Sequence, residues 1–169
     1  MSLSNLNVNV LPCYPVGSRD TGDVSFTKIH TTFPIVEAED GERKIKELFF
    51  GLLFNGMQDR KVEVDADEIF SFDANYEVRI RLAELSTGQC IDLDKFETKE
   101  KFEKIAENID GIDVFRFTHI CFFEDLSLPK NCENGDFIVK ILVKQLTGDD
   151  EADNNKPYMI QSVYHLKIV

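Results

Sequence analysis

"YEVRIRLAEL" (Tyr76–Leu85) is the stretch that decides the fold. Its apolar side chains occupy every second position: Tyr76, Val78, Ile80 and Leu82. Charged side chains fill three of the positions between them. Because successive side chains of a strand point to opposite faces, this segment has one apolar face and one wet face. That pattern is typical of an antiparallel sheet that covers a core on one side.

The same alternation, with a period of two, recurs along the chain and predicts eight to ten short strands. The further strands expected are Leu6–Leu11, 24–33, Lys61–Val64, Ile69–Phe72, Cys90–Leu93, Val114–Phe123, 137–146 and 158–169. Residues 12–23, "PCYPVGSRDTGD", contain two Pro and two Gly, which predicts a loop after the first strand. Strands of this length, punctuated by turn residues, are typical of a sandwich or barrel.

The segment "KIKELFFGLLFNG" (residues 44–56) fits two structures. A helix would leave Phe50 and Phe54 in water, and Gly51 would weaken it by about 0.5–1 kcal/mol relative to Ala. A strand from Glu47 to Phe54, buried on both faces, accommodates every Phe. We therefore predict a strand, followed by a turn at Asn55-Gly56.

One helix is expected, between Thr98 and Asn108. In "DKFETKEKFEKIAENIDG" (residues 94–111) the apolar residues follow helical spacing, which the stripe Phe102, Ile105, Ala106 and Ile109 shows. Asp94 with Glu97 resembles a capping box, Thr98 is a rival cap, and Gly111 is a suitable end.

At 169 residues the chain fits one domain, 1–169. Fourteen Phe supply material for a sizeable core, so folding needs neither a metal nor a disulfide. The expected fold class is mostly β: an antiparallel β-sandwich with one inserted short helix at about 98–108.

The last third of the chain carries a resemblance. In "FTHICFFEDLSLPKNCENGDFIVKILVKQ…YMIQSVYHLKIV", Leu126, Leu128 and Pro129 precede a long strand, and the final strand ends at Val169. This ending resembles the closing strands of immunoglobulin-like β-sandwiches among small bacterial and phage-encoded proteins. The resemblance implies that architecture and such an origin. Unlike antibody domains, the chain has no Trp and no evident Cys pair between sheets.

The net charge of −12 disfavours nucleic acid and anionic membranes as partners, because both need clustered Lys and Arg. A protein that mimics DNA is an open alternative. The first fifteen residues do not form a signal peptide, and the longest apolar run, residues 48–54, is too short to span a bilayer. A cytoplasmic protein is expected. Its four Cys, at 13, 90, 121 and 132, are expected to be small buried hydrophobic residues in a reducing compartment.

An acidic segment near the end, "TGDDEADNNKP" (residues 147–157), could bind Ca²⁺. The candidate ligands are Asp149, Asp150, Glu151 and Asp153, because hard cations take carboxylate oxygens. The segment does not match an EF-hand loop, since the Gly precedes the acids. The other interpretation is a hydrated hairpin loop without a metal or other cofactor.

No nucleophile motif or phosphate-binding loop occurs, so we do not expect an enzyme. A hydrolase based on two carboxylates stays open. His30, His119 and His165 lie in expected strands. His119 and Cys121 share one side, as two zinc ligands would, but no further ligand is evident, which favours a structural, partly buried His119.

The sequence therefore predicts a non-enzymatic interaction or assembly module. Its contact surfaces would be edge strands, which add a strand from a protein partner or from a second copy in a homo-oligomer. The candidate edges are Val24–Ile29 and the C-terminal strand. The alternative is a sandwich that binds Ca²⁺ or another ligand through the loop 149–155.

Overall fold

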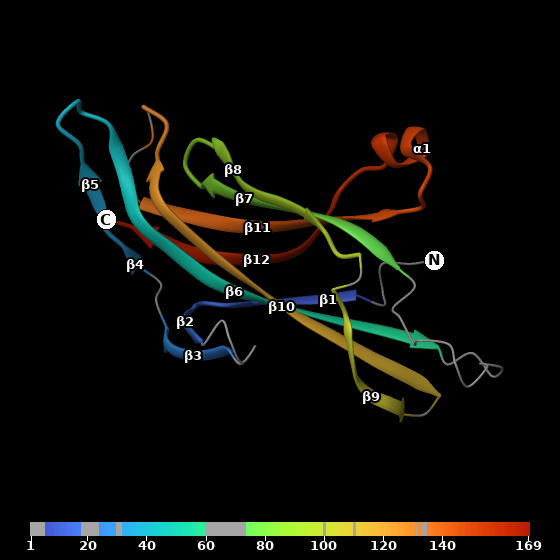
Figure 1. The fold of residues 1–169 in the computed structure, drawn as a ribbon. Helices are drawn as coiled ribbons and strands as arrows, with labels where there is room; N and C mark the ends of the chain where they lie inside the picture. Colours follow the sequence, from blue (N-terminus) through green and yellow to red (C-terminus); the bar gives the residue numbers. More distant parts are fainter. Residues whose placement is uncertain are drawn as a thin grey trace.

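The computed structural model describes residues 6–17, 24–29, 32–59, 74–99, 101–109, 111–130, 132 and 135–169. Within these ranges the chain is mostly β-structure with one short helix (Figure 1). The elements are β1 (Leu6–Leu11), β2 (Cys13–Gly17), β3 (Val24–Ile29), β4 (Thr32–Phe33), β5 (Ile35–Glu37), β6 (Arg43–Asp59), β7 (Asn75–Glu84), β8 (Cys90–Glu97), β9 (Glu103–Ile109), β10 (Ile112–Ser127), β11 (Gly135–Leu146), α1 (Asp150–Asn155) and β12 (Met159–Ile168).

The first sheet is built on the two longest strands, β6 and β10, which pair antiparallel along almost their whole length. β1 and β5 pair one after the other along the opposite side of β6, and β9 pairs with the outer side of β10. The order is β1-β6-β10-β9, with β5 also on β6.

The second sheet has the order β4-β12-β11-β7-β8. Its pairs are antiparallel except β4–β12, a short parallel contact in which Thr32 lies opposite Lys167. The described sheets are thus antiparallel or mixed. β2 and β3 form a separate two-stranded sheet beside the first one.

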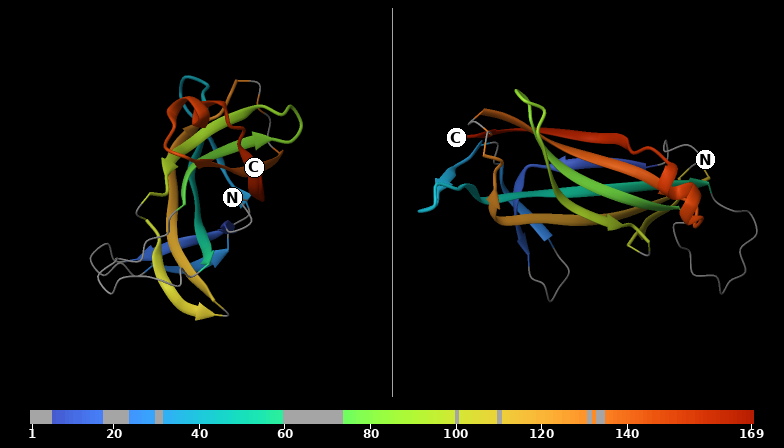
Figure 2. Two further views of the ribbon diagram at one scale, coloured as in Figure 1. Left: turned by 90° about the vertical axis from the view of Figure 1, so that its right-hand side faces the viewer. Right: turned by 90° about the horizontal axis from the view of Figure 1, so that it is seen from above.

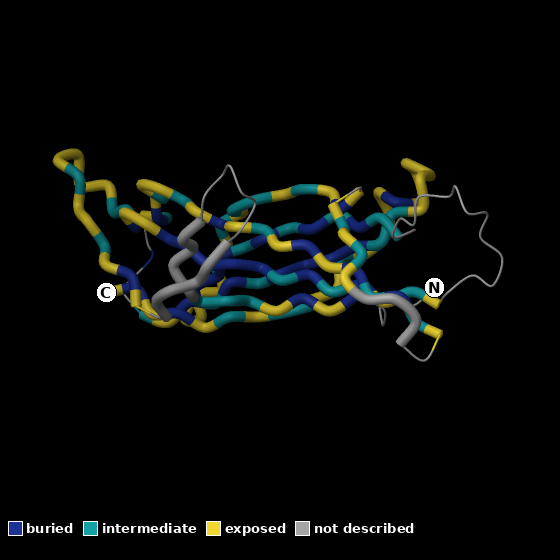
Figure 3. The backbone as a smooth tube through the Cα atoms, turned by 60° about the horizontal axis from the view of Figure 1, so that its bottom comes forward, coloured by how far each residue is buried: buried dark blue, intermediate teal, exposed yellow. Residues whose placement is uncertain are grey.

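One hydrophobic core lies between the two five-stranded sheets, which form two layers in Figure 2. The buried positions follow the middle of the long strands, as Figure 3 shows. Phe50, Phe54 and Phe137 are almost completely buried, and the ring of Phe54 stacks on Phe117 with centroids 4.3 Å apart. Each buried Phe stabilises the fold by roughly 1.5–3 kcal/mol. The apolar positions of Tyr76–Leu82 face this core, which confirms the expected alternation.

β6 confirms an extended structure for 47–54 but shows that the predicted turn at Asn55-Gly56 is wrong. The strand runs through both residues to Asp59, because each is paired on both sides. Asn55 lies opposite Asn7 and Arg116, and Arg116 Nε donates to Asn55 Oδ1 at 2.9 Å. Two flanking strands outweigh the turn preference of the Asn-Gly pair.

The predicted helix at 98–108 is also wrong, since Glu103–Ile109 form strand β9. Ile105, in the middle of the expected helical stripe, is 46% exposed. Lys104 faces inward and its Nζ lies 3.1 Å from an Asp113 carboxylate oxygen on β10. The buried Thr98 does not cap a helix, because its Oγ1 accepts a hydrogen bond from the Tyr76 backbone N–H at 3.0 Å. Pairing with distant strands thus overrides a local helical pattern.

The predicted loop 12–23 is wrong for Cys13–Gly17, which form β2. The predicted strands at Lys61–Val64 and Ile69–Phe72 lie outside the described residues, as does His30. The strand predicted over 24–33 is wrong as a single element, because it is divided into β3 and β4, which belong to different sheets. The other predicted strands within the described residues are confirmed, several with longer bounds. In the part of the chain that the structure describes, no helix has the length and apolar character needed to cross a bilayer.

Candidate functional site

The acidic segment forms the short helix α1 at one end of the two layers, where β11 ends and β12 begins (Figure 1). Asp149 is its N-cap: the carboxylate accepts hydrogen bonds from the backbone N–H of Glu151 at 3.1 Å and of Ala152 at 3.2 Å. An aspartate at this position satisfies donors that the first helical turn leaves open. Asp150 and Glu151 are exposed in that turn.

Asp153 is buried and ties α1 back to the end of β11. Its carboxylate accepts hydrogen bonds from the Thr147 N–H (2.8 and 2.9 Å), the Thr147 hydroxyl (2.8 Å) and the Gly148 N–H (3.0 Å), and Lys156 Nζ lies at 3.0 Å. Desolvation raises the pKa of Asp153, but these donors outweigh it and hold the pKa well below its usual value. Both carboxylate oxygens of Asp153 therefore already have protein partners.

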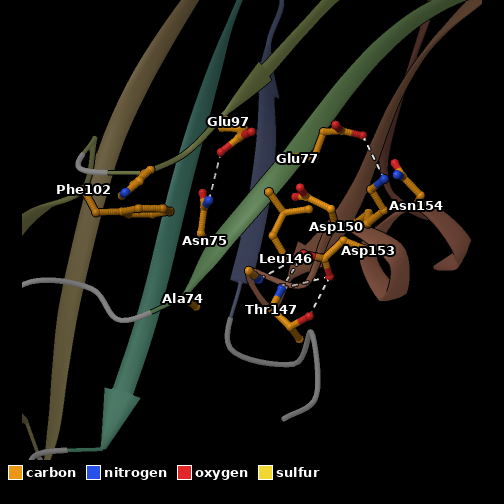
Figure 4. Close-up of a pocket in the computed structure, with 13 residues that line it drawn as sticks. Ala74, Asn75, Glu77, Glu97, Phe102, Leu146, Thr147, Asp150, Asp153 and Asn154 are labelled. Atoms are coloured by element: carbon orange, nitrogen blue, oxygen red, sulfur yellow. Dashed lines mark hydrogen bonds and ion pairs between the residues drawn. The ribbon is translucent and has the colours of Figure 1, made fainter.

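A cavity of about 820 Å³ opens beside α1, between the ends of β7, β8 and β11 (Figure 4). Of the four acidic candidates, only Asp150 and Asp153 line it. Asp149 and Glu151 do not. The other lining residues that bear charge or an amide are Asn75, Glu77, Glu97, Lys99, Lys144 and Asn154.

Glu77 lies at the centre of a second group of polar contacts in this cavity. Its carboxylate lies 2.8 Å from Lys95 Nζ and 3.1 Å from Lys144 Nζ, and it accepts a hydrogen bond from the Tyr158 hydroxyl. Desolvation raises the pKa of Glu77, and the two lysines lower it by more. Two cations lie over the Tyr158 ring: Lys144 Nζ of β11 is 4.9 Å from the ring centroid, and the Arg79 guanidinium of β7 is 4.7 Å from it.

A further polar contact of the cavity joins Asn75 and Glu97 at 3.0 Å, which Figure 4 shows. Asn75 Oδ1 is buried and has no hydrogen-bond partner among the described residues.

A carboxylic acid that donates a proton near neutral pH needs a raised pKa. Glu77 and Asp153 both have lowered values, so neither suits that task.

The sequence missed the part of this cavity that lies on β7, β8 and β11. Alternation correctly placed Glu77 on the wet face of its strand, but it could not identify the lysines across from it. Strand register is set over long range, so only a structure reveals such partners. The acidic segment itself carried a usable signal, since an Asp before an acidic turn is a common helix start.

His119 and Cys121 lie on the core side of β10, as predicted. The His119 ring stacks on Phe96 with centroids 4.1 Å apart, and Nε2 lies 3.1 Å from an Asp94 oxygen. His119 is therefore partly buried, and both contacts join it to β8. Across the described ranges, no group of three or more His, Cys, Asp or Glu is arranged to hold a metal. His165 is exposed and contacts Asp136 at 2.8 Å.

Two of the described cysteines, Cys121 and Cys132, are buried. Burial raises the pKa of the Cys121 thiol, and desolvation and Glu84 raise that of Cys132 to about 11. Neither is a thiolate near neutral pH. Cys90 is exposed, against the expectation of a buried residue, and all three are free thiols.

The free edges of the two sheets form the other candidate surface. On the side away from β11, β12 pairs only at its end, where Lys167 and Ile168 meet β4. We define residues 159–166 as the β12 edge, since no other described strand pairs with them there. Three of its apolar side chains are more than half exposed: Met159 (52%), Ile160 (62%) and Val163 (57%).

Comparison with known proteins returns no matching family model, no matching curated protein and no matching solved structure.

Proposed function

We propose that this chain is a non-enzymatic interaction module that binds a protein partner by strand addition to the β12 edge. An extended segment that joins a sheet edge gains main-chain hydrogen bonds, and neighbouring side chains select its sequence. The observation that carries the proposal is the coincidence of an unpaired edge with three exposed apolar side chains, Met159, Ile160 and Val163.

The free edges of β8 and β9 carry charged side chains, which is how natural sheets avoid unwanted pairing, whereas the edge strand β1, "LNVNVL", carries none. β8, "CIDLDKFE", carries two Asp, one Lys and one Glu, and β9, "EKIAENI", carries two Glu and one Lys. The β12 edge, "MIQSVYHL", carries no Lys, Arg, Asp or Glu. Its one irregularity is a bulge at Gln161, whose side chain turns to β1 and donates to the Leu6 carbonyl at 2.6 Å.

An immunoglobulin-like sandwich is the architecture that we propose for the two sheets. The strand orders support it: β1-β6-β10-β9 corresponds to strands A, B, E and D, and β12-β11-β7-β8 to G, F, C and C′. β12 then takes the place of the last strand of such a domain, at the edge of its sheet. A cytoplasmic location is part of the proposal, supported by the free thiols of Cys90, Cys121 and Cys132.

The experiment uses two matched variants. Ile160→Thr/Val163→Thr makes the β12 edge polar while it keeps β-branched side chains and charge unchanged. Ile105→Thr makes the same kind of change on the β9 edge, at a residue that is 46% exposed. Each immobilised protein captures partners from a lysate of the source cells, with protein quantified by mass spectrometry and melting curves recorded as a folding control.

We expect at least one protein, or a second copy of this chain, to be enriched by the wild type and by Ile105→Thr. Its enrichment by the double variant should fall about tenfold or more, because two apolar contacts of about 1 kcal/mol each are lost. If no captured protein distinguishes the double variant from the wild type, the proposal is wrong.

A further inference from the structure

The outer face of the second sheet has a charge opposite to that of the whole chain. Its positive side chains lie on four adjacent strands: Arg79, Arg81, Lys95, Lys140, Lys144 and Lys167. The acidic side chains among them are Glu77, Asp92, Glu97 and Asp136. Six positive charges against four negative ones leave +2 on this face. Since the chain carries −12, everything else on the protein carries −14.

Most of these charges are used within the face. Arg81 forms an ion pair with Asp92, and Glu77 lies between Lys95 and Lys144. Arg79 and Lys140 differ, because neither has an ion pair with any described residue. Arg79 lies over the Tyr158 ring, and Lys140 stands opposite Arg81 on one side and Val163 on the other. Arg79 also adds to Arg81 in lowering the pKa of Asp92, so Lys140 is the less engaged of the two cations.

The cationic face continues into the β12 edge. Val163 lies directly opposite Lys140, and Ile160 lies opposite Leu142, so both exposed apolar side chains border the cations on the same side of the sheet. A strand added to β12 would lie two strand spacings, roughly 10 Å, from β11. That distance is within the combined reach of a Glu side chain and Lys140. The same segment could therefore contact both kinds of side chain.

We propose that the partner segment is acidic as well as apolar: its apolar side chains pack on Ile160 and Val163 and its carboxylates pair with Lys140, while residues beyond the paired strand turn over the face to Arg79. This inference rests on the proposed strand addition and names the chemistry of the partner. Opposite charges across an interface steer association and exclude unsuitable partners. A protein segment fits better than nucleic acid, because a net charge of +2 on this face is little for a phosphate backbone and the remaining −14 repels it.

The test uses a fluorescent twelve-residue peptide of alternating Glu and Val, a matched peptide of alternating Lys and Val, and a twelve-nucleotide single-stranded DNA. Binding to the full chain is measured by fluorescence anisotropy at low and high salt. The face variant is Arg79→Gln/Lys140→Gln. Its control, Lys46→Gln/Lys130→Gln, removes two exposed lysines away from this face. The edge variant is Ile160→Thr/Val163→Thr, and melting curves confirm that each variant is folded.

We expect the Glu–Val peptide to bind the wild type and the control equally, and the face variant at least tenfold more weakly. Binding should weaken with salt, and the Lys–Val peptide should not bind. Absent binding of the Glu–Val peptide, equal binding by the face variant, or tighter binding of DNA than of the peptide would each overturn the inference. Loss of peptide binding in the edge variant alone would leave strand addition standing and reject the acidic partner. Loss in the face variant alone would support the acidic partner and count against the edge.

Discussion

At the scale of single residues, several polar side chains act as internal anchors rather than as ligands. Asp153 holds α1 to the end of β11, and Thr98 accepts a hydrogen bond from the start of β7. His119 of β10 contacts β8, because its ring stacks on Phe96 and its Nε2 lies beside an Asp94 oxygen. Burial with complete partners makes such groups sensitive to small chemical changes.

Asp153→Asn should destabilise the protein although it changes only one atom. The amide keeps the size of the carboxylate, but it loses the charge that faces Lys156 and cannot accept from all of the Thr147 and Gly148 donors. We expect the melting midpoint to fall by several degrees. Asp150→Asn, in the same helix but exposed, is the control and should melt like the wild type. Equal midpoints for both variants would remove the anchoring role of Asp153.

The lowered pKa of His119 makes the stability of the fold depend on pH. Burial lowers its pKa below 6.5, and the pairing with Asp94 offsets this only in part, while Lys101 lowers it further. The unfolded chain therefore takes up a proton at a higher pH than the folded one, so the contribution of His119 is complete above about pH 6.5 and is lost as the pH falls. Urea unfolding at about pH 7.5 and about pH 5.5 should show a smaller difference for His119→Gln than for the wild type. An unchanged difference would show that the folded and unfolded pKa values of His119 are equal.

At the scale of elements, pairing with a neighbouring strand determines whether a segment becomes a strand or a helix when its local sequence fits both. β9 exists because β10 offers it a partner, and its Lys104 reaches Asp113 across the ladder. The ion pair is largely buried: the two side chains are 14% and 5% exposed. A charge of this kind is tolerated only while its partner is present.

Asp113→Ala should cost about 3–5 kcal/mol of unfolding free energy, because it leaves a buried lysine without its carboxylate. The double variant Lys104→Met/Asp113→Leu should recover most of that loss, since apolar side chains of similar size replace the pair. Denaturant unfolding of the three proteins measures both effects. If residues 98–108 were helical, the two side chains would not meet and the double variant would recover nothing.

Alternation in the sequence predicted most strands, because each has one side on the core and the apolar positions record it. It failed for 98–108, where Phe102 and Ile105 satisfy a helical spacing equally well. The turn preference of Asn55-Gly56 also gave a wrong prediction, because the strands that pair with these residues are far away in sequence. Only one side of the candidate cavity could be predicted from the sequence. The acidic residues of α1 are neighbours in the chain, but Glu77 pairs with lysines of β8 and β11 that are distant in sequence.

At the scale of the whole molecule, charge is distributed unevenly around one shared core. The second sheet presents a face of +2 on a chain of −12 and ends in the β12 edge, which lacks formal charge. α1 and the β5 hairpin lie at opposite ends of the two layers, so neither covers the middle of the β12 edge (Figure 2). We therefore propose that a protein partner is recognised on this side of the molecule.

Amide hydrogen exchange on the chain alone and bound to a captured protein or to the Glu–Val peptide tests that claim most directly. In the free chain, amides of residues 159–166 that point away from β11 should exchange fast, because no described strand pairs with them. Binding should slow exchange in this segment and leave the free edges of β8 and β9 unchanged. Protection that appears on β8 or β9 instead, or no added protection at 159–166 in a saturated complex, would contradict the account.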